Sequence, residues 1–220
     1  MKKVNYIISY LLVVCFLISV LTISSTLALH TKTTYNFHFN DGVAFSKINS
    51  PVEPHKLSSG VTKYFVSTSK KDFQIYEVNG RFKDPIFDKK EQRIMKKVKI
   101  IFSIELLASA LTAVVFFALY RYLYSNGFKE ALNDRMRFAI YLTSGFVVAR
   151  ILAFSIKAFR HNLYMQMVGI KVDKHSLLIP IFGDPFYKSY LLFSTIIAIV
   201  LIVIAIYFKN KMTKPNRLFS

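Results

Sequence analysis

A histidine follows a series of residues that are spaced like one face of a helix. Arg150, Phe154, Lys157 and His161 are separated by four, three and four residues. At 100° per residue, Arg150 and His161 differ by about 20° around the axis if one helix runs that far. An imidazole can accept and return a proton near neutral pH, so His161 is the candidate general base. The basic residues beneath it could hold a phospholipid or lipopeptide headgroup.

Each of these residues also has a purely structural explanation. Lys157 could simply extend to the membrane interface, as lysines near helix ends commonly do. His161 could hydrogen-bond a lipid headgroup without any proton transfer. The spacing alone leaves both explanations open.

Two charged residues lie inside long apolar runs, Glu105 in the second and Arg150 in the third. An isolated charge at that depth in a bilayer is costly, so charged residues there usually pair with each other. We therefore expect an ion pair between two helices. It would either open a polar cavity for substrate or lock the helices together, and the sequence allows both.

Several common chemistries find no support. The sequence has no Gly-rich phosphate loop, no Gly-x-Ser-x-Gly elbow and no His-Glu-x-x-His pair. The only cysteine, Cys15, lies in an apolar run, and the histidines have no metal-ligand spacing. We therefore predict neither a metal nor a cofactor. The five histidines all fall in the segments between apolar runs: His30, His38, His55, His161 and His175.

The elements that carry these residues are predicted from four apolar runs. Hydrophobic residues make up 53% of the chain, and its mean hydropathy is +0.37. Runs approaching ~20 apolar residues are typical of transmembrane helices. The predicted fold is all-α, a four-transmembrane-helix bundle in a single membrane domain over 1–220. The predicted spans are about 6–29, 98–120, 138–159 and 190–208.

Short basic flanks predict the orientation. By the positive-inside rule, both termini and the connection between the second and third spans are cytoplasmic. The outer segments 30–97 and 160–189 would then form an extracytoplasmic cap. In the first of them Val61, Tyr64, Phe65 and Thr68 have helical spacing, which predicts an amphipathic helix lying on the membrane.

Two further expectations concern the termini and the charge. The first span follows Met1-Lys2-Lys3 and is longer than a typical signal peptide, which favours a retained anchor, although Thr26-Leu27-Ala28 would permit cleavage. The net charge of +18 comes from lysines and arginines beside the apolar runs. That placement suits anionic membrane lipids, and we predict no binding of nucleic acid.

Two short motifs resemble a known family. His161-Asn162-Leu163-Tyr164, followed by Leu178-Ile179-Pro180-Ile181-Phe182 and Phe186-Tyr187, is similar to the later motif of the lipoprotein intramolecular transacylases of Gram-positive bacteria. Phe87-Asp88-Lys89-Lys90-Glu91, running into Met95 and Val98, is similar to the family segment before the second span. The chain also resembles the family in its length and in the order of its spans and outer segments.

The sequence departs from the family pattern at four positions. Family members carry a second histidine where this chain has Ile94, and an aspartate where it has Lys97. Ser176 replaces a usual acidic residue and Gly183 a usual proline. Only His161 carries over as a family catalytic residue.

The resemblance implies movement of an acyl chain from the diacylglyceryl cysteine of a bacterial lipoprotein to its own amino terminus. The expected enzyme is a multi-pass protein of the cell membrane, with membrane lipids and lipoproteins as partners. From their positions we assign substrate-binding or auxiliary roles to Arg150, Lys157, Arg160, Glu91, Glu105 and Tyr164. The alternative is a non-catalytic membrane protein that binds lipid, lipoprotein or a partner, of an accessory or immunity type.

Overall fold

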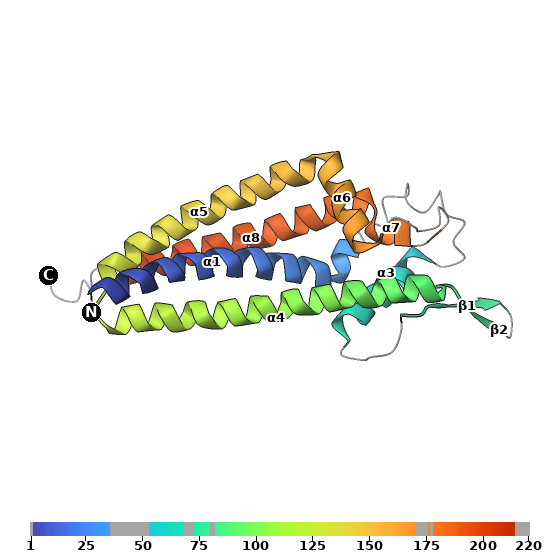
Figure 1. Ribbon diagram of the computed structural model, residues 1–220, viewed down its shortest axis with the longest axis horizontal. Coiled ribbons are helices and arrows are strands. Elements are labelled where there is room, and N and C mark those ends of the chain that lie inside the picture. Colours follow the sequence, from blue (N-terminus) through green and yellow to red (C-terminus); the bar gives the residue numbers. More distant parts are fainter. Residues whose placement is uncertain are drawn as a thin grey trace. The chain divides into compact units, whose positions relative to one another are not determined.

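The structure is a computed structural model, and it describes residues 2–35, 53–67, 73–79, 82–169, 176 and 178–213. Nearly all of this is helical, as predicted. The elements are α1 (Lys2–His30), α3 (Pro54–Val66), β1 (Tyr76–Asn79), β2 (Phe82–Pro85), α4 (Lys89–Ser125), α5 (Lys129–Ser155), α6 (Lys157–Met167), α7 (Leu178–Phe182) and α8 (Asp184–Thr213) (Figure 1).

Four helices are long and apolar enough to cross a membrane. They cover Val4–His30, Lys89–Ser125, Lys129–Ser155 and Phe186–Lys211. The mean hydropathy over an 18-residue stretch of each helix is 2.6, 2.3, 1.7 and 3.0 in the same order. The prediction of an all-α fold with four membrane-length helices is confirmed. The described residues add one element that was not predicted, the antiparallel pair β1–β2, in which Tyr76 pairs with Pro85 and Asn79 with Phe82.

The chain forms two compact units, and each contains parts of the long helices. The first unit, called the helical unit below, comprises Met1–Ser25, Glu105–Ile151 and Thr195–Ser220. The second, called the aromatic unit, comprises Thr26–Ile104 and Leu152–Ser194.

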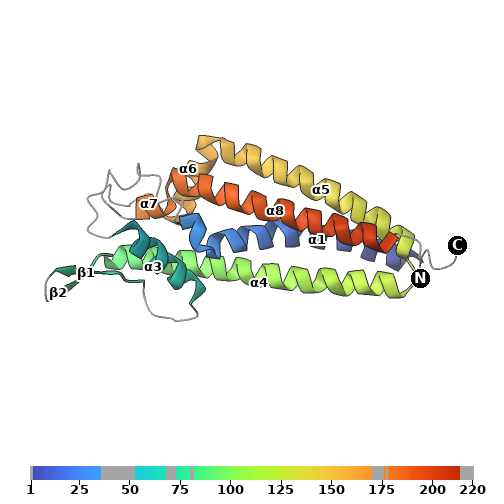
Figure 2. The ribbon, with the colours of Figure 1, turned by 180° about the vertical axis from the view of Figure 1, so that it is seen from behind.

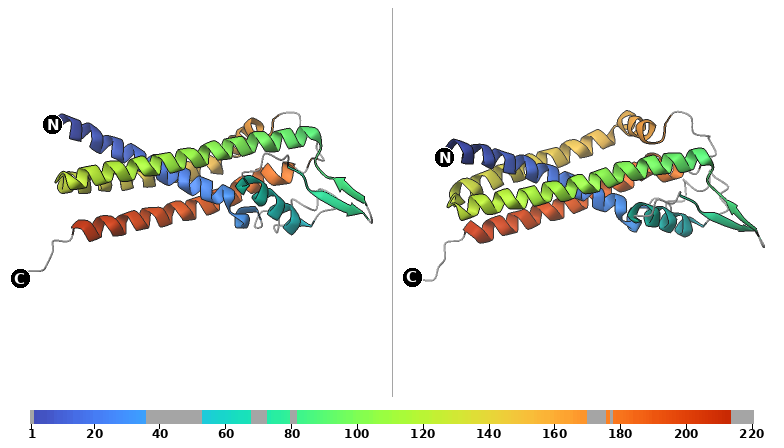
Figure 3. Two further views of the ribbon diagram at one scale, coloured as in Figure 1. Left: turned by 90° about the horizontal axis from the view of Figure 1, so that it is seen from below. Right: turned by 60° about the horizontal axis from the view of Figure 1, so that its bottom comes forward.

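In the helical unit, segments of α1, α4, α5 and α8 run alongside one another (Figures 1 and 2). The α1 segment crosses the α4 segment obliquely (Figure 3). Buried side chains from all four helices form its core, for example Phe16, Leu123, Met136 and Ala198. Such a unit is expected when the apolar side chains of several helices pack against one another.

A tight turn joins α4 to α5 in this unit. Gly127 has φ +81°, a conformation that glycine adopts without steric cost. The Phe128 amide donates to the Leu123 carbonyl (3.1 Å), and the Gly127 amide donates to the Tyr124 carbonyl (3.3 Å). These are the two hydrogen bonds of a Schellman motif, which satisfies the last carbonyls of α4. Close by, the Tyr122 hydroxyl donates to Asn5 on α1 (3.3 Å). The start of α1 and this turn therefore lie at the same end of the helical unit.

The core of the aromatic unit consists largely of aromatic side chains. Tyr35 and Phe186 stack with their centroids 5.8 Å apart, and Phe65 lies 4.9 Å from Phe102. Tyr35 also lies 6.4 Å from Phe65, so the rings join α3, α4 and α8, which are far apart in sequence. Large rings in offset or edge contact each contribute about 0.5–1.5 kcal/mol beyond their buried area.

The predicted amphipathic helix exists as α3, but its apolar face is not available to a membrane. Val61 and Phe65 are buried in the aromatic core, and Tyr64 packs against it. Thr68 lies outside the described residues. The prediction of a membrane-lying helix is therefore wrong, because the apolar face of α3 packs on protein.

Candidate functional site

The helix that carries His161 is separate from the helix that carries Arg150. α5 ends at Ser155, Ile156 adopts an extended conformation (φ −79°, ψ 117°), and α6 begins at Lys157. Arg150 and His161 could share one helix face only if a continuous helix carried both, and the helix is interrupted at Ile156. The predicted face is therefore wrong. Only its last part, Lys157 and His161 one turn apart on α6, remains.

Arg160 accounts for the helix break. Its guanidinium donates to the Phe154 carbonyl and to the Ser155 carbonyl (3.1 Å) at the end of α5. Those carbonyls have no helical partner because the helix stops there. The side chain of Arg160 thus replaces the missing hydrogen bonds.

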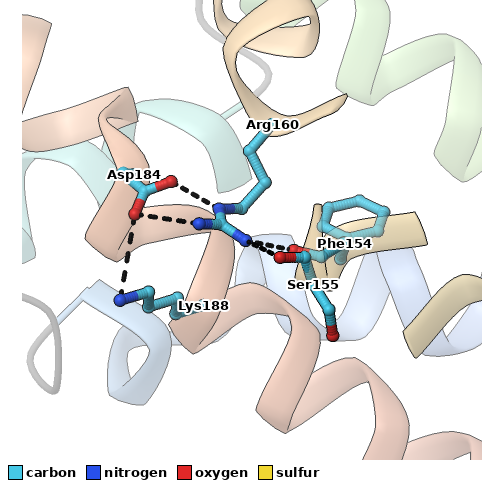
Figure 4. Close-up of polar contacts among 5 residues, drawn as sticks. All are labelled: Phe154, Ser155, Arg160, Asp184 and Lys188. Atoms are coloured by element: carbon cyan, nitrogen blue, oxygen red, sulfur yellow. Dashed lines mark hydrogen bonds and ion pairs between the residues drawn. The ribbon is translucent and has the colours of Figure 1, made fainter. Parts of the chain in front are cut away.

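The same guanidinium also binds the first turn of α8. Its Nε and Nη2 atoms donate to the two carboxylate oxygens of Asp184, the second at 3.2 Å. Lys188 Nζ lies 3.8 Å from the same carboxylate, and all these residues appear together in Figure 4. Hydrogen bonding from Arg160, with smaller contributions from the charges of Arg160, Lys188 and Lys157, lowers the pKa of Asp184. Arg160, which we predicted to bind substrate, is buried and occupied by these contacts.

His161 is exposed on α6. Within the part of the chain that the structure describes, no group hydrogen-bonds its imidazole. The ring is therefore open to a ligand from solvent or from the membrane interface. It lies beside Arg160 in sequence, so the partly buried ion pair between Arg160 and Asp184 fixes the helix turn from which His161 extends.

The residues that follow His161 anchor α6 to the aromatic core. Leu163, Tyr164 and Met167 pack against that core. Burial raises the pKa of Tyr164, so its phenol is protonated at neutral pH. The Tyr187 hydroxyl contacts the Met167 sulfur at 3.3 Å, which ties α6 to α8.

The start of α4 lies beside α6. Lys97 Nζ donates to the Gln166 carbonyl (3.3 Å). Ile94 packs against the aromatic core, in which Met95 and Val98 are fully buried. This contact brings the segment that resembles the first family motif next to the helix that carries His161. The sequence does not predict this contact of Lys97, because its partner Gln166 is 69 residues away.

Glu91 connects the segments 30–97 and 160–189, which are far apart in sequence. It accepts hydrogen bonds from the Ser176 hydroxyl and from the Asp88 amide (2.9 Å). The Asp88 carboxylate in turn accepts from the Glu91 amide (2.6 Å). This reciprocal pair is a capping box at the start of α4. Glu91 therefore positions Ser176, which also accepts from the Leu178 amide (3.1 Å).

The predicted site residues divide between the two units. Glu91, Lys157, Arg160, His161 and Tyr164 belong to the aromatic unit. Lys157 is exposed there.

Glu105 and Arg150 belong to the helical unit instead. Arg150 Nη1 donates to the Ser24 hydroxyl on α1 (3.4 Å), and both Glu105 and Arg150 are partly buried. The ion pair between them stays a prediction.

No group of three or more potential metal ligands occurs among the described residues. His30 Nδ1 lies 2.8 Å from the Thr26 carbonyl, and His55 Nε2 lies 3.1 Å from Lys32 Nζ. His38 and His175 fall outside the residues that the structure describes. The described histidines thus occupy three separate environments.

Comparison with known proteins gives matches in structure but not in sequence. No protein-family model matches the chain, and no curated protein matches it in sequence. Three solved structures of the membrane-integral lipoprotein intramolecular transacylase Lit from Bacillus cereus are similar to it.

A variant of Lit with a histidine replaced by alanine has a TM-score of 0.76 at 11% identity, covering 99% of this chain and 97% of that one. A variant with a histidine replaced by arginine has a TM-score of 0.74 at 11% identity, covering 99% and 95%. A third structure has a TM-score of 0.65 at 12% identity, covering 96% and 100%. The apolar helices and these membrane-integral neighbours support a membrane location, and the chain has the fold of the lipoprotein intramolecular transacylase Lit.

Proposed function

We propose that this protein moves an acyl chain from the diacylglyceryl cysteine of a bacterial lipoprotein to the amino group of the same cysteine. The observation that carries the proposal is the shared fold over 99% of the chain with a Lit variant. It is supported by the position of His161, the residue that resembles a family catalytic histidine, on an exposed helix of the aromatic unit.

The proposed reaction begins with the lipoprotein's terminal ammonium. His161 removes a proton from it, because only the neutral amine is a nucleophile. The amine attacks the ester carbonyl and forms a tetrahedral oxyanion. The imidazolium releases this first proton to water, and the neutral imidazole then takes a second proton from the attacking nitrogen, which has become positive. The carbon–oxygen bond of the ester breaks, and the departing glyceryl oxygen takes this second proton from the imidazolium. The products are an N-acyl amide and a free glyceryl hydroxyl, which is the lyso form.

Two features of the protein lower the barrier in this proposal. Donor ester and acceptor amine belong to one molecule, so holding the lipopeptide in one geometry makes the step effectively unimolecular. Lys157, one helical turn before His161 and exposed like it, supplies positive charge to the oxyanion. Tyr164, with its phenol kept protonated, is available as a neutral donor on the same helix.

The test is expression in a bacterial host that lacks lipoprotein N-acylation, followed by mass spectrometry of lipoprotein amino termini. We expect N-acylated lyso lipopeptides with the wild type and only diacyl lipopeptides with His161→Ala. His55→Ala is the matched control, since His55 is also exposed in the aromatic unit. Unchanged diacyl lipopeptides at good membrane expression of the wild type would refute the proposal.

A second candidate is a non-catalytic protein that binds lipid or lipoprotein. Ile94 favours it, because this side chain packs against the aromatic core at the position where the family resemblance implies a second histidine. In that case wild type and His161→Ala would retain a diacyl lipopeptide equally well in a pull-down, and neither would convert it.

A further inference from the structure

The helical unit contains a large cavity that the proposed acyl transfer does not use. Its volume is about 1080 Å³, slightly above the range of ~300–1,000 Å³ that is typical of small-molecule sites. Every lining residue belongs to the helical unit, whereas His161 belongs to the aromatic unit. None of the residues proposed for acyl transfer therefore lines this cavity.

The cavity is lined mainly by apolar side chains over most of its length. Phe16 on α1, Phe116 on α4 and Leu201 on α8 are among the lining residues. On α4 the lining extends from Ala113 to Tyr124, which is about 16 Å at 1.5 Å per residue. That is about half of the ~30 Å hydrocarbon thickness of a bilayer. The apolar part thus matches the acyl chains of one leaflet.

The charged lining residues gather at the end of the unit where α4 turns into α5. Lys129, Lys209 and Lys211 line the cavity, with Glu130 as the only acid among its lining residues. Lys129 Nζ lies 5.0 Å from the centre of the Tyr124 ring. The three lysines leave the mouth with an excess of positive charge, which attracts a phosphate group.

One polar atom near this mouth has no partner within the described part of the chain. Asn133 lines the cavity one helical turn after Lys129, and its Oδ1 is buried without a hydrogen bond. In a membrane an unsatisfied polar group is costly because no water replaces the missing partner. This oxygen is not exposed to the cavity in the structure, so the Asn133 side chain must turn for a headgroup hydroxyl to supply the missing donor.

We propose that this cavity binds one anionic glycerophospholipid of the surrounding bilayer. Its acyl chains fill the apolar part, its phosphate lies between the lysines at the mouth, and Asn133 accepts from a headgroup hydroxyl. Bound in this way the lipid connects α1, α4, α5 and α8 and stabilises the helical unit.

Native mass spectrometry of the full-length protein in detergent tests the proposal, with phosphatidylglycerol and phosphatidylcholine as probes. We expect saturation at one phosphatidylglycerol per chain and weaker binding of phosphatidylcholine. Lys129→Gln/Lys211→Gln should weaken phosphatidylglycerol binding about tenfold and weaken phosphatidylcholine binding by a smaller factor, because the choline group already neutralises its phosphate. Lys89→Gln/Lys90→Gln removes the same charge from exposed positions outside the cavity and should have little effect.

A second variant tests the apolar part independently. Ala113→Phe places a ring inside the cavity and should weaken the binding of both lipids several-fold, while circular dichroism verifies that the helices remain. Continuous binding without saturation would overturn the proposal, as would equal losses in the two lysine pairs. A dimer in place of a lipid adduct would also overturn it and indicate that a second copy covers the cavity.

Discussion

Arg160 on α6 and Asp184 on α8 form a two-point ion pair between residues 24 positions apart in sequence. The same guanidinium satisfies the carbonyls of Phe154 and Ser155 at the end of α5. One buried side chain thus fixes three helix ends. Because His161 is the next residue, this arrangement fixes the position on α6 from which the imidazole of the candidate base extends.

Replacing Arg160 should destabilise the protein more than replacing an exposed arginine. Arg160→Ala removes several charge-assisted hydrogen bonds, and we expect a loss of about 2 kcal/mol in the free energy of unfolding. Arg160→Lys keeps the charge but loses the planar fork, so it should restore only part of this loss. Since the chain has no tryptophan, unfolding in detergent is best followed by circular dichroism.

A double-mutant cycle identifies the contribution of the pair itself. Arg160→Ala, Asp184→Asn and the double variant should show a coupling energy of about 1 kcal/mol or more. Additive losses would mean that the ion pair contributes little, and that Arg160 acts mainly through the α5 carbonyls.

The stability of the protein should depend on pH through Asp184. Its pKa is lowered in the folded protein, so the folded state favours the carboxylate and the unfolded state binds the proton more tightly. The stabilisation is therefore complete above the unfolded pKa of about 3.9 and is lost as the pH falls through the lowered folded value. The difference in melting temperature between wild type and Asp184→Asn should shrink below about pH 4. A constant difference down to lower pH would contradict this.

The long helices could be predicted from sequence because their signal is local. Apolar runs of membrane length give four helices, and α4 begins at Lys89 because Asp88 and Glu91 form a capping box ahead of good helix formers. The strand pair was missed although Asn79-Gly80 next to alternating residues is a hairpin signal.

The break between α5 and α6 could not be predicted in the same way. Neither glycine nor proline marks Ile156, and the carbonyls at the break are satisfied by Arg160, whose side chain also reaches a carboxylate in another helix. Tertiary contacts of this kind have no local sequence pattern. The face from Arg150 to His161 failed for this reason, whereas Lys157 and His161 share α6 as their spacing predicted.

The hydrogen bond from Ser176 to Glu91 should make a measurable contribution to the aromatic unit. Ser176→Ala removes this bond and the acceptor of the buried Leu178 amide, so we expect a loss of about 1–2 kcal/mol. Glu91→Gln keeps a side chain that can complete the capping box, and it should cost less than Glu91→Ala. Hydrogen exchange at the Leu178 amide should accelerate in Ser176→Ala; unchanged exchange there would show that the amide does not depend on this hydroxyl.

The buried hydroxyl of Tyr35 should stabilise the end of α1. Tyr35 is fully buried and donates to the Leu29 carbonyl (2.9 Å) in the last turn of that helix. Tyr35→Phe keeps the ring but leaves a buried carbonyl unsatisfied, which should cost about 1–3 kcal/mol in the free energy of unfolding. Tyr76→Phe is the matched control because Tyr76 is exposed. Equal melting temperatures of the two variants would show that water or another donor satisfies Leu29.

If the proposed acyl transfer is correct, Lys157 should affect turnover more than substrate binding. Its charge interacts most strongly with the substrate when the oxyanion forms. Lys157→Gln should therefore lower kcat about tenfold or more with little change in KM. Lys157→Arg keeps the positive charge and should retain most of the rate. Lys63→Gln removes a lysine that is also exposed in the aromatic unit but lies on α3, and it should behave like the wild type. The measurement is the initial rate of N-acylation of a synthetic diacyl lipopeptide in detergent micelles. A rise in KM with kcat unchanged would instead assign Lys157 to uniform binding of the substrate headgroup.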